Sequence, residues 1–261
     1  MQVGGLPVLR CRALEPFADH LFTTRGWLLG SRTDAADDGW AEVAGALGVP
    51  LTALARLHQV HGAAVRRATS ANSMDRPAAD IVVTSEDAVA VAVQAADCVP
   101  LLAADRRTGA VGAAHAGWRG LAVHVPTELI SAMTREFGSE PDDLLVAIGP
   151  SIGACCYEVG IDVRDAFRAA FGERNLSRWF FDDPCPTAIN PSMARIGQAR
   201  RADHWFFDGW SATRDQLECA GVPASQIHTA QLCTASHPDL LCSYRRDGKP
   251  AGRMAGVIRR G

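Results

Sequence analysis

Three short segments of the chain combine histidine, cysteine and arginine with glycine. The first is His58-Gln59-Val60-His61-Gly62, the second contains Cys98, and the third starts at His115 and contains Arg119. Imidazole and thiolate are common ligands of zinc and copper, and a cysteine beside a histidine can also serve as a nucleophile with its base. The planar guanidinium of arginine suits phosphate or carboxylate. These residue types therefore indicate a metal site or a nucleophilic pair, with a group for binding anions nearby.

The segment Leu57–Val65 is predicted to be an extended strand broken at Gly62. Side chains alternate along a strand, so His58 and His61 would point to opposite faces and only one of them could bind a given ion. Either histidine alone is more often structural than a ligand. A lone cysteine such as Cys98, beside an apolar strand, is usually a small core residue. These residues alone therefore do not decide between a metal-binding and a structural role.

The third segment carries more meaning because of its predicted position. His115 is expected to end a strand, and a helix is expected to open directly after it. Strand ends that lead into helices are where α/β proteins place their chemistry, and a helix start offers free N–H groups and the positive end of a dipole. Gly117 and Gly120 permit close approach of the backbone. The alternative is an ordinary glycine turn with a solvated Arg119.

The remaining chain alternates apolar runs with amphipathic stretches, and we find no internal repeat and no linker longer than a loop. We therefore predict a single α/β domain spanning residues 1–261, with a central mixed sheet built from the four runs between residues 81 and 115. The predicted strands are Ile81–Thr84, Val89–Gln94, Val99–Ala104, Ala110–His115, Leu144–Ile148, Gln226–Leu232 and Gly252–Ile258. The predicted helices are Asp38–Leu47, Leu121–Phe137, Ile161–Phe171, Pro191–Arg200 and Trp210–Ala220.

Composition excludes several classes of protein. The 261 residues are 48% hydrophobic and 21% charged, with a formal net charge of −3, which is typical of a globular protein. No basic stripe predicts nucleic-acid binding, and no apolar run has the roughly 18 residues of a membrane span. The eight cysteines are irregularly spaced and no signal peptide is apparent, so we expect reduced thiols and a cytoplasmic location. The oligomeric state stays open, a homodimer included.

Three motifs in order identify a family resemblance. They are QVHG at Gln59–Gly62, ADC-x-P at Ala96–Pro100 and HAGWRG at His115–Gly120. With these, the sequence resembles the laccase-domain family, also described as multicopper polyphenol oxidase-like, YfiH-like or peptidoglycan editing factor. The chain departs from the family pattern after Arg25, where the loop is shortened, and at Cys242, where an aromatic residue is usual. Further matching segments are Ile148–Gly153, Tyr157–Gly160, Cys233-Thr234, Ser243–Arg246 and Gly252-Arg253.

The resemblance implies that His61, Cys98 and His115 hold one metal ion, because the matching residues of the three motifs do so in the family. Three protein ligands leave a position open for water or substrate, as in catalytic zinc sites. The implied fold has mixed β-sheets packed together with helices outside. The implied activity is zinc-dependent phosphorolysis of adenosine, inosine and methylthioadenosine, with adenosine deamination beside it. Cys98, His115 and Arg119 are expected to act in catalysis, and Arg119, Arg245 and Arg246 to bind nucleoside or phosphate.

Other functions remain open. A copper-dependent, laccase-like polyphenol oxidase could use the same two histidines and cysteine, although the chain has no His-x-His pair from which a trinuclear copper site is built. A metal-free hydrolase would use Cys98 as nucleophile and His115 as base. A non-catalytic zinc protein and a role in editing peptidoglycan precursors are further alternatives.

Overall fold

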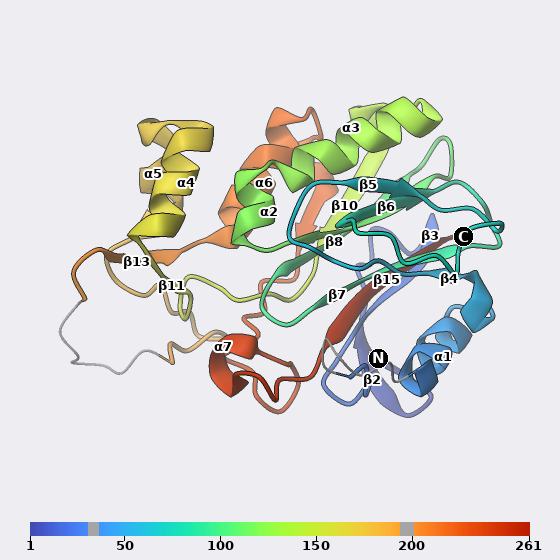
Figure 1. Cartoon of the computed structure of the whole chain (residues 1–261), viewed down its shortest axis with the longest axis horizontal. Coiled ribbons are helices and arrows are strands. Elements are labelled where there is room, and N and C mark those ends of the chain that lie inside the picture. Colours follow the sequence, from blue (N-terminus) through green and yellow to red (C-terminus); the bar gives the residue numbers. More distant parts are fainter. Residues whose placement is uncertain (31–36, 194–200) are drawn as a thin grey trace.

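The computed structural model describes residues 1–30, 37–193 and 201–261 (Figure 1). Two six-stranded mixed sheets form its centre. The first has the order β1-β2-β3-β15-β7-β4, in which only β4 and β7 are parallel neighbours. Its strands are β1 (Gln2–Val3), β2 (Leu6–Leu9), β3 (Ala18–Thr23), β15 (Met254–Arg260), β7 (Ala90–Ala95) and β4 (Leu54–Ala55).

The second sheet has the order β14-β10-β8-β9-β6-β5. Both outer pairs, β14 with β10 and β6 with β5, are parallel, and the inner pairs are antiparallel. Its strands are β14 (Ile227–Thr229), β10 (Leu144–Ile148), β8 (Val99–Asp105), β9 (Val111–Ala116), β6 (Ile81–Thr84) and β5 (Val65–Arg67).

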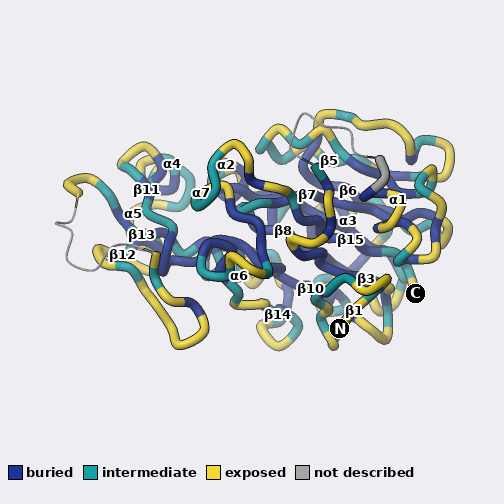
Figure 2. The backbone as a smooth tube through the Cα atoms, turned by 90° about the horizontal axis from the view of Figure 1, so that it is seen from below, coloured by how far each residue is buried: buried dark blue, intermediate teal, exposed yellow. Residues whose placement is uncertain are grey.

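The two sheets pack face to face, which explains the almost entirely apolar strand β8. Successive side chains of a strand point to opposite faces. Leu102 and Ala104 therefore lie in the core between the sheets, with Val91 of the first sheet, whereas Leu101 and Ala103 face the helices outside. Figure 2 shows the central strands buried along their length, with the exposed segments mainly in the loops.

Helices cover the outer faces of both sheets (Figure 1). Helices α3 (Val125–Phe137) and α6 (Gly209–Cys219) pack on the second sheet through residues such as Leu129, Met133 and Leu217. Helix α1 (Asp37–Ala46) packs on the first sheet. The shorter helices are α2 (Trp118–Ala122) and α7 (Tyr244–Asp247), and 3₁₀ turns lie at Leu51–Ala53, Pro141–Asp143 and Ala224–Gln226.

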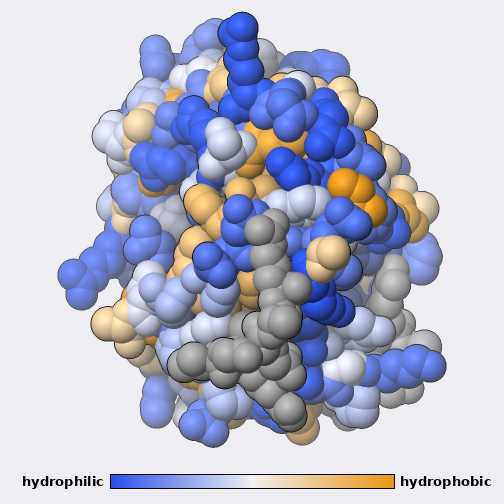
Figure 3. Space-filling model, turned by 90° about the vertical axis from the view of Figure 1, so that its left-hand side faces the viewer, coloured by the Kyte–Doolittle hydropathy of each residue, from blue (hydrophilic) through white to orange (hydrophobic). Residues whose placement is uncertain are grey.

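A smaller unit lies at the left of Figure 1. Its antiparallel sheet has the order β11-β13-β12, and helices α4 and α5 pack against it through an aromatic cluster in which the rings of Phe167 and Phe207 are 4.7 Å apart. Viewed from this end, the molecule is mainly hydrophilic, with small apolar areas between the charged side chains (Figure 3). The elements are β11 (Glu158–Gly160), β13 (His204–Phe207), β12 (Phe180–Phe181), α4 (Ile161–Phe171) and α5 (Glu173–Trp179).

The predicted α/β class, with mixed sheets packed together and helices outside, is confirmed. Among the described residues, no helix has both the length and the apolar character needed to cross a membrane. The predicted central sheet was wrong in one respect. The run Val89–Gln94 forms β7 of the first sheet, whereas its three neighbours in sequence belong to the second. Both sheets contain buried apolar strands, so the apolar character of a run does not show to which sheet it belongs.

Other local predictions also need correction. Of the segment Leu57–Val65, residues 57–64 are a loop between β4 and β5 with only a single bridge at His58, and Val65 is the first residue of β5. The predicted helix Leu121–Phe137 is two helices, because His124 adopts a left-handed conformation with φ 63°. The predicted strand Gln226–Leu232 is limited to β14. Of the predicted helix Pro191–Arg200, residues 191–193 are not helical and the rest lies outside the described residues.

Candidate metal centre and pocket

The structure brings His61, Cys98 and His115 together. One potential ligand atom from each lies within 4.8 Å of the others. The Cys98 sulfur is 3.9 Å from His61 Nε2, and the two imidazole rings are 4.9 Å apart at 81°. His115 is buried, and the other two residues are partly exposed. The three residues that the sequence motifs single out therefore form one cluster, which is open on one side.

The two sheets position Cys98 and His115. Cys98 lies in the turn between β7 and β8, where the chain crosses from the first sheet to the second. His115 is on β9 and lies opposite Pro100 of β8 in the antiparallel pair. The residue before the cysteine, Asp97, has φ 89°, which allows the tight turn at this crossing. The thiol and the imidazole are thus held by neighbouring strands.

His61 is positioned by a loop rather than by a strand. Its φ is 62°, so the alternation expected for a strand does not apply. The backbone N–H groups of residues 60–62 all donate to the carboxylate of Asp80, at 3.1, 3.0 and 2.8 Å. The side chain of Gln59 exchanges two hydrogen bonds with the backbone of Gln94, at 2.8 and 2.7 Å. The loop is therefore fixed to both sheets, because Asp80 precedes β6 and Gln94 belongs to β7.

Asp80 also orients His115. Its carboxylate accepts a hydrogen bond from His115 Nδ1 at 2.9 Å, and both side chains are buried. Donation through Nδ1 leaves Nε2 free to bind a metal, the usual arrangement of a metal-binding histidine with a carboxylate partner. Sequence reasoning missed Asp80. The sequence signal for it was an acidic residue directly before the apolar run Ile81–Thr84. A carboxylate buried at such a position requires several hydrogen-bond donors around it.

The charges in the cluster favour a thiolate. Burial raises the pKa of Cys98, but the neighbouring His115 and His61 lower it to about 6. Burial lowers the pKa of His115, but Cys98 and Asp80 raise it to about 9. At neutral pH the protein without metal therefore holds a thiolate beside an imidazolium. The thiolate is the form that binds metal, and a metal ion would displace the imidazolium proton.

Gly117 allows the three side chains to approach one another. A Cβ atom at this position would lie 2.9 Å from the Cys98 sulfur and 3.0 Å from Cδ2 of His61. Both distances are shorter than ordinary van der Waals contacts, so any larger residue would displace the thiol or the ring. The glycine in the turn between β9 and α2 thus allows close packing of the Cys98 and His61 side chains.

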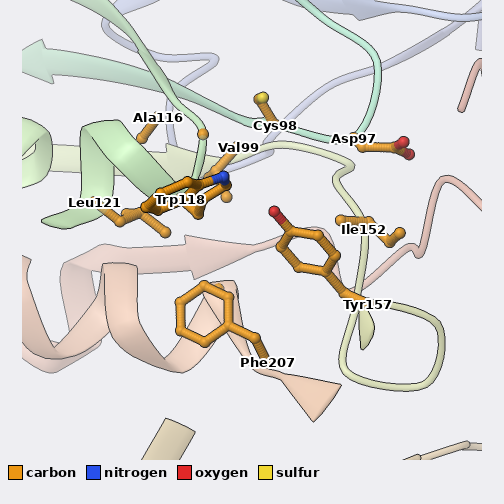
Figure 4. Close-up of a pocket in the computed structure, with 11 residues that line it drawn as sticks. Asp97, Cys98, Val99, Ala116, Trp118, Leu121, Ile152, Tyr157 and Phe207 are labelled. Carbon is orange, nitrogen blue, oxygen red and sulfur yellow. The ribbon is translucent and has the colours of Figure 1, made fainter. Parts of the chain in front are cut away.

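A small pocket opens beside Cys98 (Figure 4). Its walls are mostly apolar and include the aromatic rings of Trp118, Tyr157 and Phe207, and the Tyr157 hydroxyl points towards the side where Cys98 and Trp118 lie. Burial raises the pKa of Tyr157, so its hydroxyl is protonated and can donate a hydrogen bond. Such a concave, mostly apolar site with few polar groups is typical of binding sites for small molecules. The roles of Tyr157 and Phe207 were not predicted.

The three predicted arginines have different surroundings. Arg119 is exposed on α2, and its guanidinium lies over the Trp118 ring at 4.1 Å. Arg245 lies over the Tyr157 ring at 5.1 Å and also donates to a backbone carbonyl at 2.7 Å. Both are therefore next to aromatic walls of the pocket. The side chain of Arg246 is 11% exposed and donates to three backbone carbonyls and to a neighbouring aspartate, which indicates a structural role.

The donor set fits a zinc-like ion, since two imidazole nitrogens and one thiolate suit zinc and copper. Fold and site together describe an α/β protein with a candidate His₂Cys metal centre beside an aromatic pocket. The family described as multi-copper polyphenol oxidoreductase laccase matches residues 26–261, and the chain belongs to this family. The resemblance of the sequence motifs to the laccase-domain family is thereby confirmed.

Two relatives are named purine nucleoside phosphorylase. The protein of Deinococcus radiodurans is 34% identical over 271 residues, with 99% of this chain and 94% of that protein covered. The protein of Bacteroides thetaiotaomicron is 35% identical over 179 residues, which cover 69% of this chain and 60% of that protein.

Solved structures share the fold. The YlmD structure from Geobacillus stearothermophilus has a TM-score of 0.78 and 30% identity, covering 99% of this chain and 98% of that one. The Bacillus licheniformis hypothetical protein YfiH has a TM-score of 0.81 at 24% identity, with 99% and 98% of the two chains covered. The YfiH-like fold is therefore confirmed.

Proposed function

We propose that this protein is a zinc-dependent purine nucleoside phosphorylase that acts on adenosine, inosine and methylthioadenosine and also deaminates adenosine. The observation that carries the proposal is the convergence of His61, Cys98 and His115 beside a pocket that is lined by Cys98 and by three aromatic residues. The names of the two relatives support the same reaction class.

The three ligands would hold the ion through His61, the Cys98 thiolate and His115, and Asp80 would keep His115 in the correct tautomer. When bound by these residues, zinc would supply Lewis acidity to an oxygen of water or substrate. Trp118, Tyr157 and Phe207 provide aromatic surfaces against which a purine can stack.

The anion site requires a cation near the pocket. Arg119 meets this requirement, since its guanidinium is held by Trp118 and makes no ion pair with any described residue. Arg245 is a further candidate above Tyr157, where it would contact the nucleoside. Phosphate held by Arg119 would be oriented towards the ribose, whereas deamination requires water in place of phosphate.

A metal-free cysteine hydrolase is the second candidate. It is favoured by the Cys98 thiolate beside His115, whose other ring nitrogen donates to Asp80, since nucleophile, base and orienting carboxylate are then all present. The family description points to a copper oxidase as well. Metal analysis of the purified protein, followed by activity assays with zinc, with copper and after chelation, separates the three candidates. Hydrolase activity that survives complete chelation would contradict the zinc proposal.

The decisive assay measures adenine release and inosine formation from adenosine with phosphate present. Cys98→Ala should abolish both activities and the bound metal while the protein stays folded. Arg119→Lys keeps the charge but loses the planar fork, so phosphorolysis should fall by about 10-fold or more, the loss of one charge-assisted bidentate contact. Deamination should change little. Equal losses in both activities would show that Arg119 supports the site generally rather than positioning phosphate.

A further inference from the structure

A second cluster of potential metal ligands lies outside the site described above. It consists of Cys155, Cys156 and Cys233, whose sulfur atoms all lie within 4.8 Å of one another. The three residues are buried, with exposed fractions of 2%, 7% and 0%. The adjacent pair follows β10, and the third cysteine follows β14, where its backbone forms a single bridge with Ser151. The cluster thus joins two loops that are distant in sequence.

Polar groups lie around these sulfur atoms. The N–H of Gly153 donates to the Cys233 sulfur at 3.4 Å, and the N–H of Met193 donates to the Cys156 sulfur at 3.4 Å. The Ser236 hydroxyl, which itself donates to the Pro191 carbonyl at 2.7 Å, has its oxygen 3.4 Å from the Cys156 sulfur and 3.6 Å from the Cys155 sulfur. A hydrogen bond donated to a buried sulfur stabilises its charged form, so the N–H of Gly153 favours a thiolate at Cys233.

The spacing matches a three-sulfur site. Sulfur atoms arranged in a plane around one zinc ion, each about 2.3 Å from it, lie roughly 4 Å apart. The three sulfur atoms all lie within 4.8 Å of one another, close to this spacing. The Ser236 hydroxyl stands beside two of the sulfurs and could close the site as an oxygen ligand. Thiolates select soft cations such as Zn²⁺ and Cu⁺ over Mg²⁺ or Ca²⁺.

We propose that Cys155, Cys156 and Cys233 form a second metal site, which binds a thiophilic cation, Zn²⁺ or Cu⁺. The site is structural, because its three ligands are buried. It is independent of the proposed function, which depends on the cluster of His61, Cys98 and His115.

The position of the second site gives it an effect on the first. Tyr157, in the wall of the pocket, directly follows Cys156. Thr234 directly follows Cys233, and its hydroxyl donates to Asp97 at 2.6 Å. Asp97 in turn precedes Cys98. A cation that binds the two loops together would therefore fix both the aromatic wall and the turn that carries the catalytic thiol.

The experiment starts from full-length protein carrying His61→Ala and Cys98→Ala, which removes the first site. The metal-free protein is prepared anaerobically with a reductant and titrated separately with Zn²⁺, Cu⁺ and Co²⁺. We expect one equivalent of cation to bind, and Co²⁺ to give the intense absorption of thiolate ligation. Competition with a zinc chelator and a copper(I) chelator then shows which cation is preferred.

Two substitutions test the ligands. Cys155→Ser or Cys233→Ser in this background should lower the cation affinity at least 100-fold, whereas Cys219→Ser, at an exposed cysteine, should leave it unchanged. X-ray absorption of the zinc-loaded parent provides a measurement that needs no change in the cluster, and should give three sulfur neighbours. Absence of binding, a zinc shell dominated by nitrogen, or full binding by both serine variants would overturn the proposal. So would a disulfide within the cluster that persists under reductant.

Discussion

Replacing Asp80 with asparagine tests how the candidate metal centre is held. Oδ1 accepts from the N–H of His61 and from His115 Nδ1, and Oδ2 accepts from the N–H groups of Val60 and Gly62. Asparagine has one carbonyl oxygen and one NH₂ group. It can therefore keep only one of these two pairs of hydrogen bonds.

Either orientation of the amide damages the site. With its NH₂ towards His115, the amide forces the ring proton from Nδ1 to Nε2, the nitrogen needed for the metal. With its NH₂ towards residues 60 and 62, it leaves two N–H groups without an acceptor and loosens the loop that carries His61. Each buried donor left without a partner costs about 1–3 kcal/mol. The first orientation leaves one such donor, the N–H of His61, and the second leaves two, so Asp80→Asn should lower the free energy of unfolding by about 1–6 kcal/mol. Zinc affinity should fall about 10- to 100-fold, as for other carboxylates behind histidine ligands.

The assay combines zinc competition titration with denaturant unfolding of the metal-free protein. Asp105→Asn is a matched control, because Asp105 is also buried and its Oδ1 accepts the N–H bonds of Arg107 and Thr108, which an amide oxygen can keep. The control should bind zinc like the parent. Unchanged zinc affinity in Asp80→Asn would refute the reasoning, whatever the change in stability.

Three further predictions follow from the same geometry. Gly117→Ala should weaken zinc binding at least 10-fold in a competition titration, because its Cβ would lie 2.9 Å from the Cys98 sulfur; Gly45→Ala, with open space at the Cβ position, should bind zinc normally. In metal-free protein, alkylation of Cys98 followed by peptide mapping should reach half its maximal rate near pH 6, since the thiolate is present above that pKa and lost below it. A midpoint near pH 8.5, the ordinary value of a thiol, would contradict the proposed ion pair. Arg246→Ala removes hydrogen bonds from a charged guanidinium and should lower the free energy of unfolding, measured with denaturant, by about 2–4 kcal/mol. A raised KM with unchanged stability would instead show that Arg246 contacts the substrate.

The elements predicted correctly are those in which the local sequence pattern and the tertiary packing favour the same structure. Helix α4 has the bounds expected from its pattern, with glycine directly after its last residue, Phe171. The end of β9, predicted at His115 and found at Ala116, was predictable within one residue, because a run of small apolar residues stops at Gly117 and is followed by a helical pattern. In both cases short-range preferences and tertiary packing favour the same structure.

Other features depend on contacts that are distant in sequence. The loop of residues 57–64 has the composition of a strand, yet contacts with Asp80 and Gln94 hold its backbone in another conformation. The helical spacing of apolar residues continues across His124, so the sequence gives no sign of the left-handed residue that separates α2 from α3. Motif matching identified His61, Cys98 and His115, but a motif contains no information about a carboxylate 35 residues before His115.

The position of β15 links the candidate metal centre to a segment distant in sequence. This strand lies between β3 and β7, and it pairs with both over most of its length. Strand β7 leads directly into the turn with Cys98, so pairing with Met254–Arg260 fixes the strand that enters this turn. Pairing between segments so distant in sequence is slow to form. We therefore expect the cluster of His61, Cys98 and His115 to reach its final geometry late in folding.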